Sequence, residues 1–243
     1  MQAATDTDWR IDPVGDRCLM IEFGQRVDLK INAKVHALAN HLLEHPIPGV
    51  IDLVPAFTTV AIHYEPQRLA KAALAGESAY AALARMLSQI LARGTNITET
   101  ATRTIEIPVC YDEEFGPDLA QIADTHGLSI NEVIRIHTAC EHTVYMLGFA
   151  PGFAYMGGLD ERLAMPRRST PRTRIPAGTV AIAREQSAVY TVESPGGWNL
   201  MGRTPLRFFD PETEPPTLLR PGDRVRFTQV SRERYEQIAA EHA

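Results

Sequence analysis

The sequence predicts an α+β protein in which a small mixed domain precedes a β-rich domain. Three observations carry this prediction. Strand and helix patterns alternate along residues 1–94, the stretch at 95–103 is polar without periodicity, and short β-rich runs separated by glycine and proline dominate the second half. Such runs are typical of a closed or strongly curved sheet. We therefore expect two domains, at residues 1–94 and 104–243, joined by a linker at 95–103.

The first domain is predicted to follow the order strand, helix, strand, strand, helix. Residues 15–23 form a strand because apolar side chains alternate along them. Asp28 caps the following helix, whose apolar residues recur at helical spacing. Two β-branched strands follow, at residues 50–54 and 58–64. The last helix ends near Gly94 and carries an apolar stripe of Leu83, Leu87, Ile90 and Leu91.

The second domain is predicted to begin with one strand and two helices. The strand covers residues 105–109, and the first helix covers residues 118–126. Ser129 and Glu132 form a capping box that opens the second helix. Residues 235–242 form a polar tail that we expect to make a final helical turn. Between these helices and the tail lie five β-rich runs, at residues 144–149, 178–183, 188–192, 206–209 and 225–230.

Composition limits the classes of protein to consider. With 243 residues and 44% hydrophobic content, the chain is ordinary for a globular protein. Its polar start and lack of a long apolar run predict a cytoplasmic protein without membrane contact. Cys18, Cys110 and Cys140 are widely spaced, which indicates neither a disulfide framework nor a metal site. The last lysine is Lys71, so no later residue can carry biotin.

Residues 148–209 form a basic, glycine-rich segment within an acidic chain. They hold eight arginines against four acids, whereas the whole chain has a net charge of −6. Half of the 16 glycines also lie here, which is typical of backbone that turns tightly or approaches a ligand closely. A local basic segment indicates a small anionic ligand, in contrast to a nucleic acid spread over the surface.

Four arginines, Arg167, Arg168, Arg172 and Arg174, are interleaved with prolines in this segment. Proline disfavours helix, so we expect extended backbone that holds the guanidinium groups at fixed positions. Planar guanidinium groups suit carboxylate or phosphate, which makes these residues candidates for ligand binding. The alternative is a solvated loop whose arginines pair with surface acids.

His137, at the end of its predicted helix, is a candidate proton carrier. It could equally fix the helix end by a hydrogen bond. Residues 193–198 combine an acid, a hydroxyl and a glycine turn that could offer hydrogen bonds to an oxyanion. The alternative is a structural turn beside a core tryptophan. The candidates in this segment are Glu193 and Ser194 for catalysis and Gly196, Gly197 and Trp198 for binding.

Aromatic residues near Pro151 could line a pocket or a partner surface, or simply pack a loop. Phe149, Phe153 and Tyr155 are the candidates for contact with a partner.

Three motifs resemble the signature of the KipI-like family. They are residues 147–159 (LGFAPGFAYMGGL), 166–178 (PRRSTPRTRIPAG) and 193–205 (ESPGGWNLMGRTP). The family comprises the B subunit of bacterial 5-oxoprolinase, allophanate hydrolase subunit 1 and the corresponding half of the urea amidolyase carboxyltransferase. The likeness covers nearly the whole chain, and extends through residues 15–16, 21–24, 107–112 and 221–223.

The resemblance implies a small α/β domain followed by a cyclophilin-like β-barrel. It also implies a KipA-like partner, the C subunit of 5-oxoprolinase, with which the active site is shared, and a third subunit. Such a complex cleaves 5-oxoproline to glutamate at the expense of ATP. Both substrates are anionic, which agrees with the anionic ligand that the arginines indicate. Arg203 of the third motif is a further candidate for substrate binding.

One loop departs from the family pattern. Relatives commonly have GGQTGIY where this chain has REQSAVY at residues 184–190. Gln186 and Tyr190 persist and are further binding candidates, whereas the lost glycines would have given access to positive φ. Two alternatives to 5-oxoprolinase therefore stay open: a carboxyltransferase subunit of the allophanate or urea branch, and an inhibitor of a sensor histidine kinase.

Overall fold

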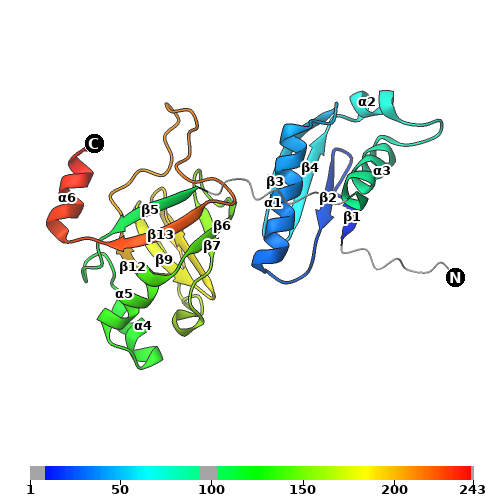
Figure 1. Ribbon diagram of the computed structural model, residues 1–243. Helices are drawn as coiled ribbons and strands as arrows, with labels where there is room; N and C mark the ends of the chain where they lie inside the picture. Colours follow the sequence, from blue (N-terminus) through cyan, green and yellow to red (C-terminus); the bar gives the residue numbers. More distant parts are fainter. Residues whose placement is uncertain (1–8, 94–102, 242–243) are drawn as a thin grey trace. The chain divides into compact units, whose positions relative to one another are not determined.

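The computed structural model describes residues 9–93 and 103–241. The chain divides into two compact units between residues 101 and 102 (Figure 1). The predicted linker at 95–103 lies, except for its last residue, outside the described residues.

The first unit is a four-stranded antiparallel sheet with the order β1-β2-β4-β3. Asp28 caps the first long helix as predicted, because its carboxylate accepts hydrogen bonds from the N–H groups of Lys30 and Ile31. The strands are β1 (Arg10–Pro13), β2 (Cys18–Glu22), β3 (Val50–Pro55) and β4 (Thr59–Tyr64), and the helices are α1 (Leu29–Glu44), α2 (Pro66–Leu69) and α3 (Ala79–Ala92), with a 3₁₀ turn at Ala70–Ala72.

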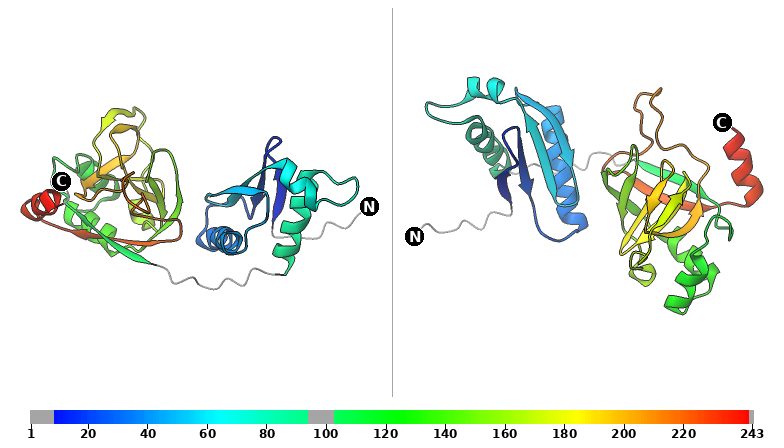
Figure 2. Two further views of the ribbon diagram at one scale, coloured as in Figure 1. Left: turned by 90° about the horizontal axis from the view of Figure 1, so that it is seen from above. Right: turned by 180° about the vertical axis from the view of Figure 1, so that it is seen from behind.

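Both long helices of the first unit cover the same face of its sheet (Figure 2). Alternate residues of β2, Leu19 and Ile21, are fully buried against Leu38 of α1 and Leu83 of α3. This alternation is the period-2 pattern on which the strand prediction rested. The sequence prediction omitted β1 and α2, which have only four residues each.

The second unit is built on a seven-stranded sheet with the order β12-β9-β10-β7-β6-β13-β5. Its two edge strands meet, because Cys110 and Arg203 exchange two backbone hydrogen bonds of 2.9 Å and so close the sheet into a barrel. The strands are β5 (Thr104–Val109), β6 (His142–Leu147), β7 (Ala154–Gly157), β9 (Thr179–Ala183), β10 (Gln186–Val189), β12 (Asn199–Arg203) and β13 (Arg224–Gln229).

A two-stranded ribbon and three helices complete the second unit. The ribbon pairs β8 (Arg172–Ile175) with β11 (Ser194–Gly196). The capping box of Ser129 and Glu132 is present as predicted, with both of its hydrogen bonds. The helices are α4 (Leu119–His126), α5 (Ile130–Ala139) and α6 (Arg232–Glu241), with a 3₁₀ turn at Glu161–Leu163.

The strand β9 shows how the barrel wall separates two clusters of buried residues. Val180 and Ile182 belong to the large core that includes the helices α4 and α5. Ala181 and Ala183 belong to a second, aromatic-rich cluster together with Ile175 of the ribbon. Because side chains alternate along a strand, the two sets lie on opposite faces of the wall. The small alanines on one face leave room for the aromatic residues discussed below.

The predicted strand at residues 206–209 is wrong. Only an isolated bridge between Phe209 and Thr217 forms there, although Phe208 is buried. Apolar side chains of this segment pack against the core without a strand partner, which a pattern of hydrophobicity cannot reveal. Conversely, β12 was missed because asparagine and glycine, at Asn199 and Gly202, are depleted in strands.

Candidate functional site

The arginine segment, which we define as residues 167–174, folds back onto the start of α4. Arg172 donates two hydrogen bonds to the carboxylate of Asp118, of 2.9 and 2.8 Å, and Arg168 donates one of 2.9 Å. The Asp118 side chain is only 4% exposed. These two arginines therefore share one buried acid that lies about 50 positions earlier in the sequence, a partner that sequence reasoning missed. The alternative of a solvated loop paired with surface acids does not describe Arg168 and Arg172, because their partner is buried.

The other two arginines of the segment are exposed. Arg174 forms an ion pair of 2.7 Å with Glu193, and the two side chains are 76% and 49% exposed. Arg167 lies over the ring of Trp198, with its guanidinium carbon 5.8 Å from the ring centroid. The exposed ion pair of Arg174 and the cation–π contact of Arg167 are both weak, so either guanidinium can bind an anion from solvent. Arg167 and Arg174 are therefore the cations of the segment that remain available to a ligand.

The turn at residues 193–198 lies beside the arginine segment. The N–H of Arg168 donates to the carbonyl of Gly197 at 2.8 Å, and Gly196 pairs with Arg172 across the ribbon. The structure thus brings the second and third motifs together, as a shared site requires. Ser194 donates to the carbonyl of Val192 at 3.3 Å, so its hydroxyl is engaged locally.

Aromatic rings form the floor beneath this turn. Phe153 contacts Tyr155, Tyr190 and Trp198 with ring centroids 4.9, 5.5 and 6.2 Å apart. Burial raises the pKa of Tyr190 above its usual value. Trp198 is nearly buried, as the alternative of a core tryptophan predicts, and its role as a wall of a site stays a prediction.

The predicted partner residues differ in exposure. The Phe149 residue is 62% exposed and has a φ of 69°, a conformation that a non-glycine residue rarely adopts. Phe153 is only 2% exposed, so the prediction that it meets a partner is corrected: it is a core residue that supports Phe149, with ring centroids 5.2 Å apart. Tyr155 is half-buried. Phe149 is therefore the best placed of the three to contact another molecule.

The altered loop at 184–190 makes a tight hairpin between β9 and β10. Gln186 pairs with Ala183, and Arg184 takes the turn with a φ of 53°. The expectation that loss of glycine removes access to positive φ is wrong at this position, because arginine adopts the same backbone region at some cost in strain. Gln186 is half-buried, in the strand next to β7, which carries Tyr155.

Arg203 lies with a different group of residues. Its guanidinium stacks on Phe115, 4.6 Å from the ring centroid, and Arg232 of α6 stacks on the same ring at 4.2 Å. None of these contacts involves the arginine segment. We therefore assign Arg203 to the attachment of α6 to the barrel.

His137 lies in the interior of the second unit. It is fully buried, stacks on Phe227 at 4.7 Å, and its Nδ1 lies 2.8 Å from the hydroxyl of Tyr111. Burial lowers its pKa well below the usual range. A fully buried imidazole with a lowered pKa does not suit the expected role of proton carrier at a site open to substrate. The alternative, a side-chain hydrogen bond that fixes the helix end, is not observed either, because the Nδ1 contact is to the hydroxyl of Tyr111.

The buried histidines predict acid sensitivity of the second unit. Burial lowers the pKa of His142, which is fully buried beside His137, to about 4. Because the unfolded chain binds a proton near pH 6.5 and the folded chain does not, the free energy of unfolding should fall as pH drops from 6.5 to 4. We expect His142 to contribute about 3 kcal/mol to this loss. Urea unfolding at about pH 7 and about pH 4.5 measures it. The variant His142→Gln should flatten the dependence, and an unchanged slope would contradict the assignment.

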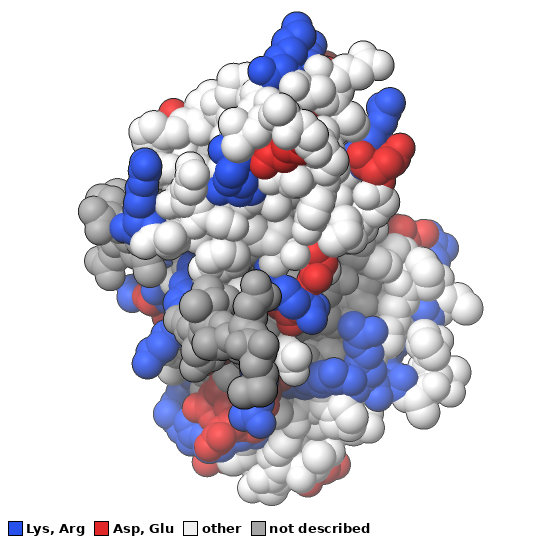
Figure 3. Space-filling view, turned by 90° about the vertical axis from the view of Figure 1, so that its right-hand side faces the viewer, with Lys and Arg blue, Asp and Glu red and all other residues white. Residues whose placement is uncertain are grey.

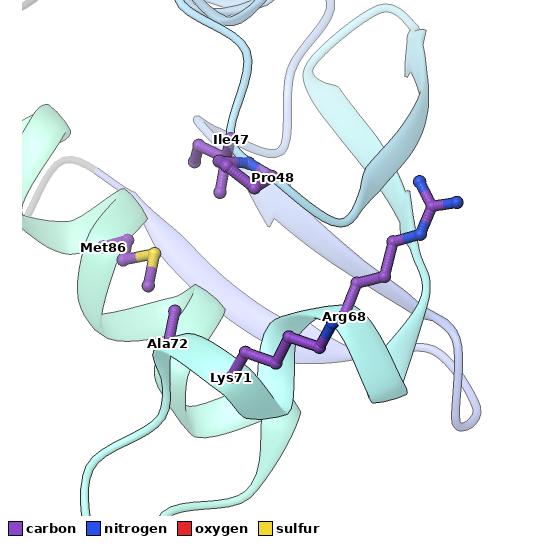
Figure 4. A pocket seen from close by; sticks show the side chains of 6 residues that line it. All are labelled: Ile47, Pro48, Arg68, Lys71, Ala72 and Met86. Carbon is purple, nitrogen blue, oxygen red and sulfur yellow. The ribbon is translucent and has the colours of Figure 1, made fainter.

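The first unit contains a separate cavity of about 340 Å³ (Figure 4). Apolar residues and the stems of two cations line it, and the guanidinium of Arg68 points away from Met86 and Ala72. Arg68 instead pairs with Glu65 at 2.5 Å. The lining residues, all from the first unit, are Ile47, Pro48, Arg68, Lys71, Ala72 and Met86.

Basic side chains are not confined to the arginine segment. Figure 3 shows them distributed over one face among uncharged and acidic side chains. The presence of basic side chains alone therefore does not mark a binding surface.

No helix in the part of the chain that the structure describes is long and apolar enough to cross a membrane. The same residues contain no group of three or more His, Cys, Asp or Glu side chains arranged to hold a metal ion.

Comparison with known proteins gives a family match. The family model for the carboxyltransferase domain, subdomain C and D, matches residues 9–219. The 5-oxoprolinase B subunit of Bacillus subtilis is 45% identical over 234 residues, which cover 96% of this chain and 98% of that protein. The urea amidolyase of Lachancea kluyveri is 25% identical over 92% of this chain, but the match covers only 13% of that protein.

Solved structures agree with the observed fold. The crystal structure of TTHA0988 has a TM-score of 0.74 and 39% sequence identity, and covers 88% of this chain. This chain spans 40% of that one. The urea carboxylase of Kluyveromyces lactis has a TM-score of 0.71 at 21% identity, over 96% of this chain and 23% of that one. The predicted fold class, a mixed domain followed by a barrel, is confirmed.

Proposed function

This chain belongs to the family of the carboxyltransferase domain, subdomain C and D, and we propose that it acts as the B subunit of an ATP-dependent 5-oxoprolinase. The observation that carries the proposal is the 45% identity to a 5-oxoprolinase B subunit over nearly the full length of both proteins. The reaction would be the opening of 5-oxoproline to glutamate at the expense of ATP.

The charges of the candidate site suit these substrates. The carboxylate of 5-oxoproline and the phosphates of ATP are anions, and Arg167 and Arg174 are the exposed cations of the arginine segment. Arg167 would bind one of these anions over Trp198. The N–H groups of the turn at Gly196 and Gly197 would supply further hydrogen bonds, as the oxyanion hypothesis for residues 193–198 requires. ATP would supply the free energy of ring opening, and biotin would play no part on this chain.

The proposed enzyme is an assembly of several chains. We propose that this chain works with a KipA-like C subunit and a third subunit. Phe149 would lie at a contact with one of them, because a partner that covers this exposed aromatic ring removes apolar surface from water. Glu193, which is exposed, and Ser194, which is half-buried, remain the proposed catalytic candidates on this chain.

A carboxyltransferase of the urea or allophanate branch is the second candidate. The distant likeness to urea amidolyase favours it, and the biotin would then have to arrive on another chain. Inhibition of a sensor histidine kinase is the remaining alternative from the sequence motifs.

A substrate profile separates these functions. The assembled complex would be supplied with ATP and, in turn, with 5-oxoproline, with urea and a biotin carrier, and with a sensor histidine kinase. We expect ATP hydrolysis to rise only with 5-oxoproline. Turnover that depends on the biotin carrier, or inhibition of kinase autophosphorylation without turnover, would replace the proposal by the corresponding alternative.

A further inference from the structure

Asp118 stands out among the acids of the second unit because it is buried yet touches separate elements. It directly precedes α4, and its side chain is 4% exposed. Its carboxylate accepts hydrogen bonds from the backbone N–H of Leu200 in β12, at 2.7 Å, and from the guanidinium groups of Arg168 and Arg172. A buried carboxylate with this many donors is held in one position.

The backbone around Asp118 makes the attachment to the barrel rigid. Its own N–H donates to the carbonyl of Leu200 at 3.2 Å, so residue and strand are joined in both directions. Leu200 in turn belongs to the aromatic-rich cluster with Trp198. The carboxylate is thus fixed to the same strand region that carries the floor of the candidate site.

The arginine segment depends on this carboxylate for much of its position. Ahead of β8, two hydrogen bonds join its backbone to the candidate site. The N–H of Arg168 donates to the carbonyl of Gly197, and the carbonyl of Pro166 accepts from the side-chain amide of Asn199 at 2.9 Å. The side chains of Arg168 and Arg172 supply the charged attachment, and both end on Asp118.

The position of Arg167 depends on the residues beside it, which are held by these contacts. It lies between Pro166 and Arg168, and its guanidinium rests over Trp198 without a carboxylate partner among the ion pairs of the described residues. A cation–π contact at an exposed site is weak, about 0.5 to 1 kcal/mol, so it cannot by itself fix the backbone that carries Arg167. The backbone hydrogen bonds of Pro166 and Arg168 hold it on either side, and the side chains of Arg168 and Arg172 add a charged anchor on Asp118.

We infer that Asp118 is a positioning residue of the candidate site, whose carboxylate holds the arginine segment so that Arg167 lies over Trp198 and can meet an anionic group of the substrate. The role in activity rests on the proposed function, whereas the role in holding Arg167 over Trp198 does not. The two parts can therefore be tested separately.

Asp118→Asn tests the inference, and Asp223→Asn is its matched control. Asn keeps the shape of the side chain and an acceptor for Leu200 but removes the charge. Asp223 is a carboxylate of the same unit, with a side chain 6% exposed, and it pairs with Arg103 and accepts from the N–H of Arg220 at 2.8 Å. Both variants lose a buried ion pair, but only Asp118→Asn disturbs the arginine segment.

The first readout is independent of activity. In a Trp9→Phe background Trp198 is the remaining tryptophan, and its fluorescence quenching by acrylamide reports how well it is covered. We expect Asp118→Asn to raise quenching of Trp198 while Asp223→Asn leaves it unchanged, with stability measured alongside. Equal quenching in the two variants would overturn the inference, whether or not the wild-type complex is active.

The second readout is kcat/KM for 5-oxoproline in the assembled complex. A displaced binding group can cost about 100-fold in rate, and we expect a loss of this order for Asp118→Asn alone. Asp118→Glu, which keeps the charge, should recover part of it. Equal losses of kcat/KM in Asp118→Asn and Asp223→Asn would show that Asp118 has only a structural role. A wild-type complex that fails to convert 5-oxoproline would refute the proposed function while the fluorescence result still decides the inference.

Discussion

Replacement of Arg172 by alanine should destabilise the second unit as well as abolish the activity of the complex. Arg172 donates two of the hydrogen bonds that neutralise the buried carboxylate of Asp118. The free energy of unfolding should fall by about 2 kcal/mol, because Asp118 loses two hydrogen bonds to its charged carboxylate but keeps those from Arg168 and the N–H of Leu200. Urea unfolding of the isolated chain measures the loss, and kcat/KM of the assembled complex measures the effect on activity.

Arg174→Ala is the control for this prediction. Arg174 lies in the same strand, two residues away, but its ion pair with Glu193 is exposed to solvent. Exposed pairs contribute about 0 to 1 kcal/mol, so the free energy of unfolding should hardly change. If Arg172→Ala unfolded at the same urea concentration as Arg174→Ala and the wild type, the hydrogen bonds from Arg172 to Asp118 would not stabilise the fold.

Gly196→Ala should have the second large effect. A Cβ atom at this position would lie 2.0 Å from the hydroxyl oxygen of Tyr190, far inside van der Waals contact. Tyr190 is only 2% exposed and packs against Phe153, so its ring has little room to retreat. Overpacking of this kind costs about 1 to 3 kcal/mol. We expect a lower urea midpoint and altered near-ultraviolet circular dichroism from the displaced aromatic rings.

The adjacent Gly197 provides a matched comparison. An added Cβ there would meet its nearest neighbour, the carbonyl oxygen of Arg168, at 3.6 Å, which is ordinary contact. Gly197→Ala should therefore unfold like the wild type. Similar destabilisation by both substitutions would show that the turn itself, and not the contact with Tyr190, requires glycine.

The sequence predicted those parts of the fold that depend on neighbouring residues. The cap at Asp28, the capping box of Ser129 and Glu132 and the buried alternation in β2 are local patterns, and all three are present. Closure of the barrel is different, because it joins Cys110 to Arg203, residues far apart in the sequence. No spacing in the sequence encodes such a bridge, and β12 itself has poor strand propensity.

The same distinction holds for the candidate site. Prolines and arginines marked the segment 167–174, and the structure does bring it to the turn at 193–198. Sequence reasoning treated the four arginines as equivalent, whereas Asp118, which lies in a separate helix region, divides them into a buried pair and an exposed pair. His137 lies in the core because its helix turns that face inward, a matter of tertiary packing.

The most direct test of the proposed function is glutamate formation from 5-oxoproline and ATP in an omission experiment. The complete mixture contains this chain, the KipA-like subunit and the third subunit, and each is left out in turn. The proposed function predicts glutamate and matching ATP hydrolysis in the complete mixture, and loss of glutamate formation when this chain is omitted. Glutamate formed at the same rate without this chain, or none formed by a stable complete complex, would contradict it.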